Sequence, residues 1–198
     1  MENKEEKPKL GCVVMAAGNA SRFGENKLAA KVRGKSLVQH ALEAVPADKL
    51  DAVAVVTQYP EVLDLAETFG FSGIYNPHPD WGISHTIRLG LMPLLDFDAV
   101  LFQVSDQPLL CRESVRDLVN FYLEHPDKII GLGHDGVRGT PCLFPRRFFP
   151  ELLELTEDHG GNTVIRRHEE DLLIFEAPKQ ELTDVDTPKA LEELTQAL

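Results

Sequence analysis

The chain has 198 residues, of which 43% are hydrophobic and 26% charged, and its formal net charge is −12. This length suits one α/β domain with a sizeable core, and no apolar stretch approaches the roughly 20 residues needed to cross a bilayer. The acidic balance argues against nucleic-acid and anionic-membrane binding, because both require a cationic protein surface. Any phosphate-binding site must therefore be local.

The start of the chain is polar and rich in lysine and glutamate, without the apolar core of a secretory signal. We expect residues 1–9 to form a flexible leader and residues 10–198 to form a single domain. Cys12, Cys111 and Cys142 are widely spaced in apolar surroundings, which predicts reduced, mostly buried thiols and no disulfide framework or zinc ribbon. Together these features favour a cytoplasmic protein.

Strands and helices alternate along the first two thirds of the chain. Apolar runs predict strands at residues 10–15, 51–57, 71–75 and 98–104, and a short extended piece is expected at residues 27–35. Helical spacing predicts helices at residues 37–45, 60–69, 85–95 and 112–124, with Ser36 and Ser84 as N-caps. This alternation predicts parallel strands joined by right-handed crossovers, with helices on both faces of one open sheet.

The remainder of the chain is less regular. It predicts strands at residues 129–130, 141–144 and 172–175, and helices at residues 146–155, 162–168 and 188–197. We therefore expect one mixed α/β domain without internal repeats or linkers.

The first predicted strand leads into a loop of small residues, 16–27, that holds one arginine and one lysine. Backbone N–H groups in such a loop can approach an anion closely, and Arg22 and Lys27 can neutralise a triphosphate. The spacing excludes a P-loop, because Gly18 and Gly24 are six apart and the lysine comes three residues after Gly24. The second and third glycines of a dinucleotide fingerprint are also missing, which disfavours an NAD-dependent reductase. An ordinary strand-to-helix turn remains the alternative for this segment alone.

Carboxylates follow at two later points. Asp106 comes directly after the strand at residues 98–104, and ligands gather at the carboxyl ends of parallel strands. The loops that begin near Ala16, Asn76 and Ser105 should therefore converge. The alternative for Asp106 is a turn or helix cap before Pro108.

The second acidic cluster, Asp184 and Asp186, precedes the last predicted helix. Asp186 or Thr187 could instead cap that helix, with Pro188 in its first turn. Two carboxylates from separate loops suit an octahedral Mg²⁺ whose other positions are filled by phosphate oxygens and water. Together with the loop at residues 16–27, they indicate nucleoside-triphosphate chemistry.

At this point the motifs resemble those of MobA-like nucleotidyltransferases, and most of all molybdenum cofactor cytidylyltransferases. The resemblance rests on A-A-G-x-x-S-R-[FM]-G-x-x-K at residues 16–27, D-Q-P at 106–108 and D-x-D-T-P at 184–188. Three further segments match: N-P-x-x-x-W-G-x-S at residues 76–84, R-G-x-P at 138–141 and G-G at 160–161. The resemblance implies a Rossmann-like three-layer sandwich with a mostly parallel central sheet, of the nucleotide-diphospho-sugar transferase type.

The resemblance also implies roles for individual residues. Arg22, Lys27 and Asp106 would be catalytic, and Asp106 and Asp186 would bind Mg²⁺, with Asp184 as the alternative second ligand. Nucleotide contacts would come from Ala16, Ala17, Gly18, Asn19, Ala20, Ser21, Arg22, Lys27, Asn76, Ser84 and Asp106. The acceptor side would be lined by Arg138, Gly139, Gly160 and Gly161.

The implied reaction transfers CMP from CTP to a phosphate-bearing acceptor, with molybdopterin favoured, and releases pyrophosphate. Alternatives are a guanylyltransferase, a sugar- or polyol-phosphate nucleotidyltransferase of the same fold, and a non-catalytic molybdenum cofactor chaperone with a molybdenum hydroxylase as candidate partner. A carrier needs no triphosphate and metal site, so the cations and carboxylates argue against the chaperone. His85 and His159 depart from the family pattern, and we interpret both as rim histidines rather than bases.

Overall fold

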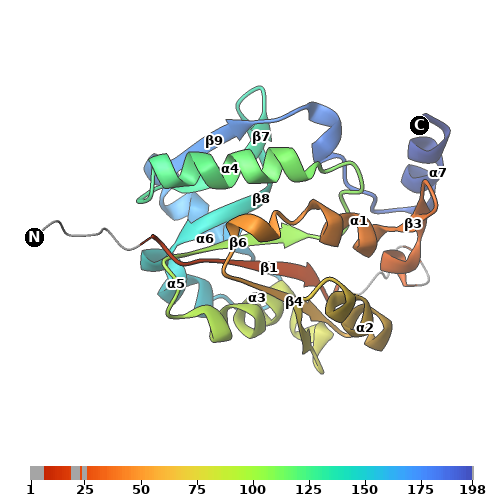
Figure 1. Cartoon of the computed structure of the whole chain (residues 1–198), viewed down its shortest axis with the longest axis horizontal. Helices are drawn as coiled ribbons and strands as arrows, with labels where there is room; N and C mark the ends of the chain where they lie inside the picture. Colours follow the sequence, from red (N-terminus) through yellow and green to blue (C-terminus); the bar gives the residue numbers. More distant parts are fainter. Residues whose placement is uncertain (1–6, 19–22, 24–25, 198) are drawn as a thin grey trace, which may run out of the picture.

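The computed structural model describes residues 7–18, 23 and 26–197 (Figure 1). Within these residues a central sheet is flanked by helices on both faces. The described sheet has seven strands in the order β5-β4-β1-β6-β8-β7-β9. The strands are β1 (Leu10–Ala16), β4 (Ala52–Thr57), β5 (Ser72–Tyr75), β6 (Ala99–Val104), β7 (Ile129–His134), β8 (Val137–Pro145) and β9 (Leu172–Glu176).

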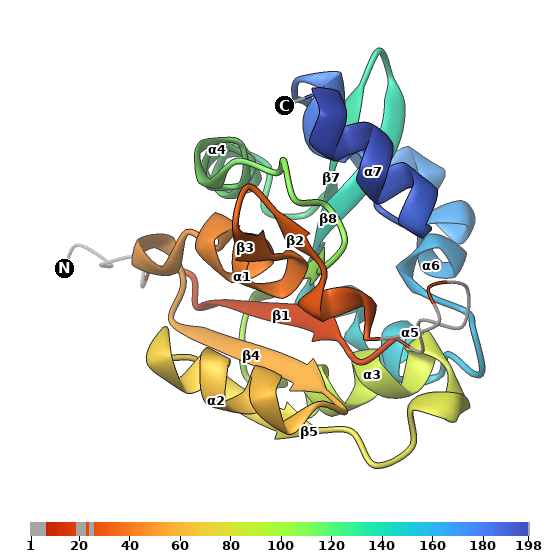
Figure 2. The same ribbon diagram turned by 90° about the vertical axis from the view of Figure 1, so that its right-hand side faces the viewer.

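The sheet is mostly parallel. Strands β5, β4, β1 and β6 pair in parallel, and so do β7 and β9, whereas β8 pairs antiparallel with both β6 and β7. Gly11 of β1 lies opposite Ala52 of β4 and Val100 of β6, so these three strands end at the same edge. Figure 2 shows the arrowheads of β1 and β4 reaching this edge together.

Helices cover both faces of the sheet, as the alternation predicts. In Figure 2, α1, α2 and α4 lie on the left of the sheet, while α3, α5 and α6 lie on its right. The helices are α1 (Leu37–Ala44), α2 (Pro60–Thr68), α3 (Ile83–Leu91), α4 (Arg112–Glu124), α5 (Phe149–Leu153), α6 (Gly161–Arg167) and α7 (Pro188–Ala197). No helix in the described ranges is both long enough and apolar enough to pass through a membrane.

Alternate residues of β1 enter two separate cores. Cys12 and Val14 pack with α1, α2 and α4 on one face, and Val13 packs with α3, α5 and α6 on the other. Gly90 allows α3 to approach closely, because a Cβ there would lie 2.3 Å from a methyl carbon of Val13. Burial on both faces explains why the central strands are continuous apolar runs rather than alternating ones.

The predicted helix at residues 85–95 has wrong boundaries. Helix α3 begins at Ile83 after Gly82 as N-cap, so Ser84 lies inside the helix and does not cap it. A 3-10 turn, Met92–Leu94, replaces the last turn. Pro93 causes this early end, because it has no N–H to donate to the carbonyl four residues before it.

Two other elements also differ from the prediction. The helix expected at residues 146–155 is a 3-10 turn, Arg146–Phe148, followed by the short α5, since Pro150 lacks the N–H that a continuous helix needs. The piece expected to be extended at residues 27–35 begins with a 3-10 turn, Lys27–Ala29. A small hairpin of β2 (Lys31–Val32) and β3 (Lys35–Ser36) follows.

Capping at the starts of α1 and α7 follows the sequence. The Ser36 hydroxyl accepts a hydrogen bond from Gln39 N at 3.2 Å, and the Thr187 hydroxyl accepts one from Ala190 N at 3.1 Å. Thr187 rather than Asp186 therefore caps α7, which leaves the Asp186 carboxylate available for other contacts.

The structure tests the predictions for the chain start and the cysteines at a few residues. Lys9 N donates to Asp98 Oδ2 at 2.7 Å, so Lys9 is tied to the fold. Residues 1–6 lie outside the described ranges. Cys12 and Cys142 are buried free thiols and Cys111, at the start of α4, is exposed, so the cysteines are mostly buried, as expected.

Candidate functional site

A cleft of about 630 Å³ lies at the carboxyl edge of the sheet, where β1 and β6 end. Loops that leave this edge of a parallel sheet form its walls, as is typical of open α/β folds. The lining residues are Met15, Ala16, Ala17, Gly18, Phe23, Lys27, Leu28, Pro79, Asp80, Gly82, Ile83, Thr86, Val104, Ser105, Asp106, Asp158 and Asp186.

Lys27 joins two carboxylates in this cleft. Its ammonium nitrogen lies 2.9 Å from Asp106 Oδ2 and 2.7 Å from Asp186 Oδ1. The Lys27 side chain is only 14% exposed, whereas the Asp186 carboxylate is 56% exposed and faces the solvent side of the cleft. The structure thus brings together three side chains that the sequence assigned to one site from segments far apart in the chain.

Local structure fixes the position of Lys27. The Asn26 side chain caps the 3-10 turn Lys27–Ala29 by accepting a hydrogen bond from Leu28 N at 3.1 Å, and its amide donates to Glu61 Oε1 at 2.9 Å. Leu28 is buried against the core below. The lysine therefore leaves a short, anchored turn at the cleft wall.

Hydrogen bonds between loops fix the carboxylates. Val185 N donates to the carbonyl of Asp106 at 2.8 Å, and Gln107 Nε2 donates to Asp184 Oδ1 at 3.0 Å. The Ser105 hydroxyl donates to the Met15 carbonyl at 2.9 Å, which ties the end of β6 to the end of β1. Asp184 therefore positions the loop, and Asp186 reaches the cleft.

The charges in the cleft affect the ionisation of two groups. Burial alone would lower the pKa of Lys27, but the hydrogen bonds and negative charges of Asp186 and Asp106 outweigh burial and raise this pKa above its ordinary value. Lys27 is therefore a permanent cation near neutral pH. Burial raises the pKa of Asp184, and the neighbouring charge of Asp106 raises it further.

The carboxylates have the donor atoms that a hard divalent cation needs. Asp106 Oδ1 is buried and has no hydrogen-bond partner among the described residues, although a buried carboxylate oxygen normally has one. Asp186 is exposed to the cleft beside it. Mg²⁺ prefers such carboxylate oxygens together with phosphate and water. This pair fits Mg²⁺ better than a pair containing Asp184, whose Oδ1 already accepts from Gln107.

The loop after β1 contributes backbone to the cleft. Ala16, Ala17 and Gly18 line it, and the carbonyl of Ala17 accepts a hydrogen bond from Gln58 Nε2 at 3.0 Å. A Cβ on Gly18 would meet nothing within 4 Å, so the space above this residue is open. Asn19, Ala20, Ser21 and Arg22, which the sequence assigned to phosphate binding, lie outside the described residues.

Asn76 and Ser84 lie beneath the cleft wall instead of on it, since both are buried and neither lines the cleft. Asn76 Nδ2 donates to Thr86 Oγ1 at 3.3 Å, and Asn76 Oδ1 accepts from His78 N at 2.9 Å. Thr86 does line the cleft. In this structure Asn76 positions the wall, and its predicted nucleotide contact stays a prediction.

The residues assigned to the acceptor side lie at a second, smaller cavity. Arg138, Gly160 and Gly161 line a space of about 110 Å³ that shares Met15 and Ile83 with the main cleft. Gly139 does not line it but packs beside Leu182, whose Cδ2 would lie 3.1 Å from a Cβ on this glycine. Val104 lines both spaces as well, so the two cavities adjoin each other.

The interpretation of His85 as a rim residue is wrong. Its side chain is buried, and its ring centroid lies 4.8 Å from the ring centroid of Trp81 in an edge-on contact. Neither ring nitrogen has a hydrogen-bond partner within the described ranges, and burial lowers the pKa of His85, so the ring is neutral. His159 is exposed, and its Nδ1 lies 3.0 Å from the Thr156 carbonyl oxygen.

Several cleft residues were not found from the sequence. Asp80 and Asp158 add two carboxylates to the lining, and Thr86 adds a hydroxyl group. Each is a single polar residue in a loop or first helical turn, without a spacing that distinguishes it from surface residues. Only contacts between loops that are distant in sequence bring these residues to the cleft.

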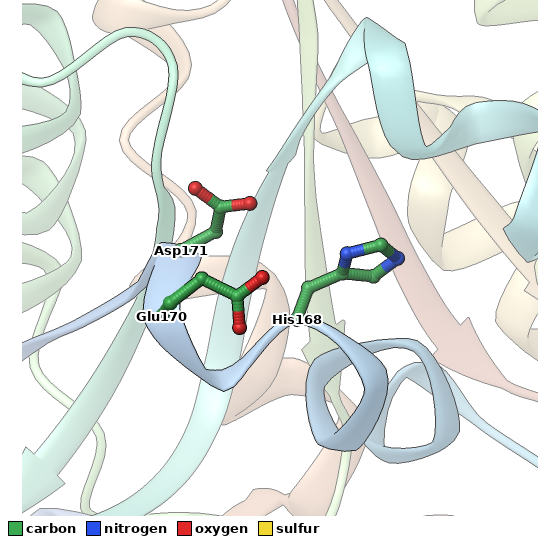
Figure 3. Close-up of side chains that lie close together, drawn as sticks. All are labelled: His168, Glu170 and Asp171. Carbon is green, nitrogen blue, oxygen red and sulfur yellow. The ribbon is translucent and has the colours of Figure 1, made fainter.

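A group of potential metal ligands lies away from the cleft. His168, Glu170 and Asp171 lie close together just before β9 (Figure 3). Asp171 Oδ1 lies 2.9 Å from both Lys128 Nζ and a guanidinium nitrogen of Arg147, and these cations lower its pKa. Because β9 runs parallel to β7, this group lies at the amino edge of the sheet, and we interpret it as a structural ion-pair network.

Comparison with known proteins gives a family and several relatives. The family model described as MobA-like NTP transferase domain matches residues 12–172. Purine catabolism protein PucB of Bacillus subtilis (strain 168) is 24% identical over 204 residues, which cover 96% of this chain and 98% of that protein. A probable molybdenum cofactor guanylyltransferase of Thermococcus sibiricus is 43% identical over 61 residues, which cover 30% of this chain and 31% of that protein.

A solved structure supports the fold. A nucleotidyl transferase from Methanothermobacter thermautotroptrophicus superimposes with a TM-score of 0.80 at 20% identity, covering 96% of this chain and 97% of the other. This likeness concerns the fold alone. It confirms the expected α/β sandwich with a mostly parallel sheet, of the nucleotide-diphospho-sugar transferase type.

Proposed function

Because the chain belongs to the MobA-like NTP transferase family, it is a nucleotidyltransferase, and we propose that it transfers CMP from CTP to a phosphate-bearing acceptor of the molybdopterin type. The observation that carries this proposal is the contact of Lys27 with both Asp106 and Asp186 in the main cleft. A cation and two carboxylates at the carboxyl edge of the sheet suit a triphosphate that binds together with a divalent metal.

In the proposed reaction, an oxygen of the acceptor phosphate attacks the α-phosphorus of CTP. A new P–O bond forms while the bond from the α-phosphorus to the bridging oxygen of the β-phosphate breaks, and pyrophosphate leaves with that electron pair. The products are a diphosphate-linked cytidine conjugate and pyrophosphate. A phosphate monoester is largely dianionic near neutral pH, so the attacking oxygen needs no general base.

The protein contributes mainly charge and position to this reaction. The Lys27 ammonium group would bind the triphosphate and neutralise part of its negative charge. We propose Arg22 as a second cation. Asp106 and Asp186 would hold Mg²⁺, which supplies neutralisation of the triphosphate oxygens when bound. Preorganised groups of this kind are each worth about 10²–10³-fold in rate.

The acceptor is proposed to lie against the smaller cavity, where Arg138, Gly160 and Gly161 are found. The choice of molybdopterin, and of a molybdenum hydroxylase as a later partner, rests on the resemblance of the six motifs. The two adjoining cavities are lined by residues from Met15 to Asp186, which supports one catalytic domain over residues 10–198. We propose that this domain is cytoplasmic. GTP is the second candidate nucleotide, because the matched segment of the Thermococcus sibiricus protein belongs to a probable guanylyltransferase.

Pyrophosphate release from CTP in the presence of molybdopterin and Mg²⁺ tests the proposed roles. Lys27→Ala and Asp106→Ala should reduce the rate by at least about 10²-fold while the far-UV circular dichroism stays unchanged. Lys35→Ala is the matched control, because Lys35 forms a surface ion pair with Glu43 outside the cleft. Full activity in either cleft variant would contradict the proposal.

The nucleotide preference is tested separately by thermal unfolding with CTP, GTP, ATP or UTP and Mg²⁺. A ligand that binds the native state raises its stability by mass action, so the preferred nucleotide should raise Tm the most. We expect CTP to give the largest shift. A larger shift with GTP would favour the guanylyltransferase, and no shift with any triphosphate would count against a nucleotide site.

A further inference from the structure

Asp186 lies in a stretch of chain with little regular structure of its own. A 3-10 turn, Lys179–Leu182, ends four residues before it, and α7 begins two residues after it. None of the residues Pro188–Ala197 of α7 is buried, so this helix has little buried apolar surface to hold the segment in place. The position of the Asp186 carboxylate must therefore be set mainly by contacts on its amino-terminal side.

Glu181, in that 3-10 turn, is a buried carboxylate with a hydrogen bond to each oxygen. It is only 4% exposed, and it accepts from Cys111 N at 3.0 Å and from the Ser114 hydroxyl at 3.0 Å. Cys111 is the N-cap of α4, and its own side chain makes no capping hydrogen bond. In a capping box, a glutamate three residues into the helix accepts from the N-cap N–H, and Glu181 takes this role from 70 residues along the chain. Its negative charge also suits the positive end of the helix dipole.

The segment that contains Glu181 runs antiparallel to the loop between β6 and α4. Next along this segment, Asp184 Oδ1 accepts from Gln107 Nε2 at 3.0 Å. Val185 N then donates to the Asp106 carbonyl at 2.8 Å. Later positions in one segment thus contact earlier positions in the other. Glu181 closes one end of this contact, and the two carboxylates of the proposed metal site stand together at the other end.

We propose that Glu181 is a positioning residue for the metal, because its bonds to the start of α4 hold the segment so that Asp186 stands beside Asp106. The inference rests on the proposed function, in which these two carboxylates hold a divalent metal. Glu181 does not line the cleft, and both its oxygens already accept hydrogen bonds within the protein. Without Glu181 the segment would also populate positions in which Asp186 has left Asp106. The apparent metal affinity then falls in proportion to the fraction of molecules that keep the two carboxylates together.

Electron paramagnetic resonance of Mn²⁺ in the presence of CTP measures this affinity without turnover. Glu181→Ala should weaken Mn²⁺ binding at least about fivefold, because fewer molecules hold both carboxylates together. Glu181→Gln should retain most of the affinity, since its amide can accept from Cys111 N and donate to the Ser114 hydroxyl. In turnover, excess Mg²⁺ favours the position that binds it. Glu181→Ala should therefore raise the Mg²⁺ concentration needed for the half-maximal rate and change the rate at saturating Mg²⁺ by less than about twofold.

Two further variants and one metal-free measurement complete the test. Asp51→Ala is the matched control, because Asp51 Oδ2 also accepts from a backbone N–H of a distant segment, Leu10 N at 2.8 Å, but at the amino edge of the sheet. It should lower Tm without changing the Mn²⁺ affinity. Ser114→Ala removes one of the two bonds to Glu181 while alanine suits α4, so it should weaken Mn²⁺ binding at least about twofold and carries the test should Glu181→Ala not fold. Without metal, hydrogen exchange at Val185 N–H should be faster in both the Glu181 and the Ser114 alanine variants, because the segment opens locally.

The inference is overturned if the folded variants among Glu181→Ala and Ser114→Ala bind Mn²⁺ as tightly as the unmodified protein, or if their hydrogen exchange at Val185 is unchanged. An equal loss of Mn²⁺ affinity in Asp51→Ala would also contradict it, as would a lower rate at saturating Mg²⁺ with an unchanged Mg²⁺ requirement. Failure of the proposed function is distinguishable, because unchanged Mn²⁺ affinity in Asp106→Asn would contradict the metal site itself. Weaker Mn²⁺ binding in Asp106→Asn but not in Glu181→Ala would contradict only the role of Glu181.

Discussion

Gly82 connects the loop before α3 to the opposite wall of the cleft, and replacing it with alanine should be costly for two independent reasons. Its φ of +82° and ψ of −178° fall in a region that is essentially restricted to glycine. A Cβ would also lie 2.3 Å from the Glu157 carbonyl oxygen and 2.7 Å from Asp158 Oδ1. Backbone strain of about 1–3 kcal/mol and overpacking of about 1–3 kcal/mol together predict a loss of about 2–6 kcal/mol.

Urea unfolding followed by circular dichroism measures this loss, and each kcal/mol should lower Tm by about 2–4 °C for a chain of this size. Gly136→Ala is the matched control, because its φ is +72° but a Cβ there would meet nothing within 4 Å. We expect the control to lose only about 1–2 kcal/mol from the left-handed conformation. If Gly82→Ala loses no more stability than Gly136→Ala, the close contact with Glu157 does not limit this position.

Three further changes give distinct expected results. Asp106→Asn should weaken the binding of Mn²⁺ in the presence of CTP about tenfold or more, because it removes a hard anionic ligand. Electron paramagnetic resonance measures this affinity, and an unchanged value would mean that Asp106 is not a metal ligand. Asn76→Ala should cost about 1–3 kcal/mol in urea unfolding, because it leaves His78 N and Thr86 without their partner, and a smaller loss would mean that water replaces it. Burial raises the pKa of Tyr122 to about 12 from 10.0, so the native state retains this proton longer than the unfolded chain. As the pH rises from about 10 to about 12, the free energy of unfolding should therefore fall by about 3 kcal/mol more in the unmodified protein than in Tyr122→Phe. Parallel curves of unfolding free energy against pH for the two proteins would contradict this expectation.

The sequence predicted the existence of most elements but not their ends. The apolar runs that become β1, β4 and β6 are unambiguous because both faces of each strand are buried. Strand β7 was expected at only two residues, since Gly131 and Gly133 interrupt its apolar pattern. Both glycines lie where a Cβ would contact β8. The need for glycine at these two positions therefore arises only from the folded sheet.

The site was predictable to the extent that it follows strand ends and motifs. Lys27 and Asp106 follow β1 and β6, and parallel strands bring their ends together. The hydrogen bond between Gln107 and Asp184, and the burial of His85, depend on contacts between loops distant in sequence. No periodicity or spacing encodes such contacts, so local reasoning could not find them.

Phosphorus NMR of the reaction mixture follows the proposed nucleotidyl transfer itself. With CTP, molybdopterin and Mg²⁺, we expect pyrophosphate and a new diphosphate linkage to appear in equal amounts, and Asp106→Asn to suppress both together. Formation of orthophosphate without the new linkage would identify a hydrolase, and the absence of any metal-dependent change in the CTP signals would contradict a nucleotidyl-transfer site at Lys27, Asp106 and Asp186.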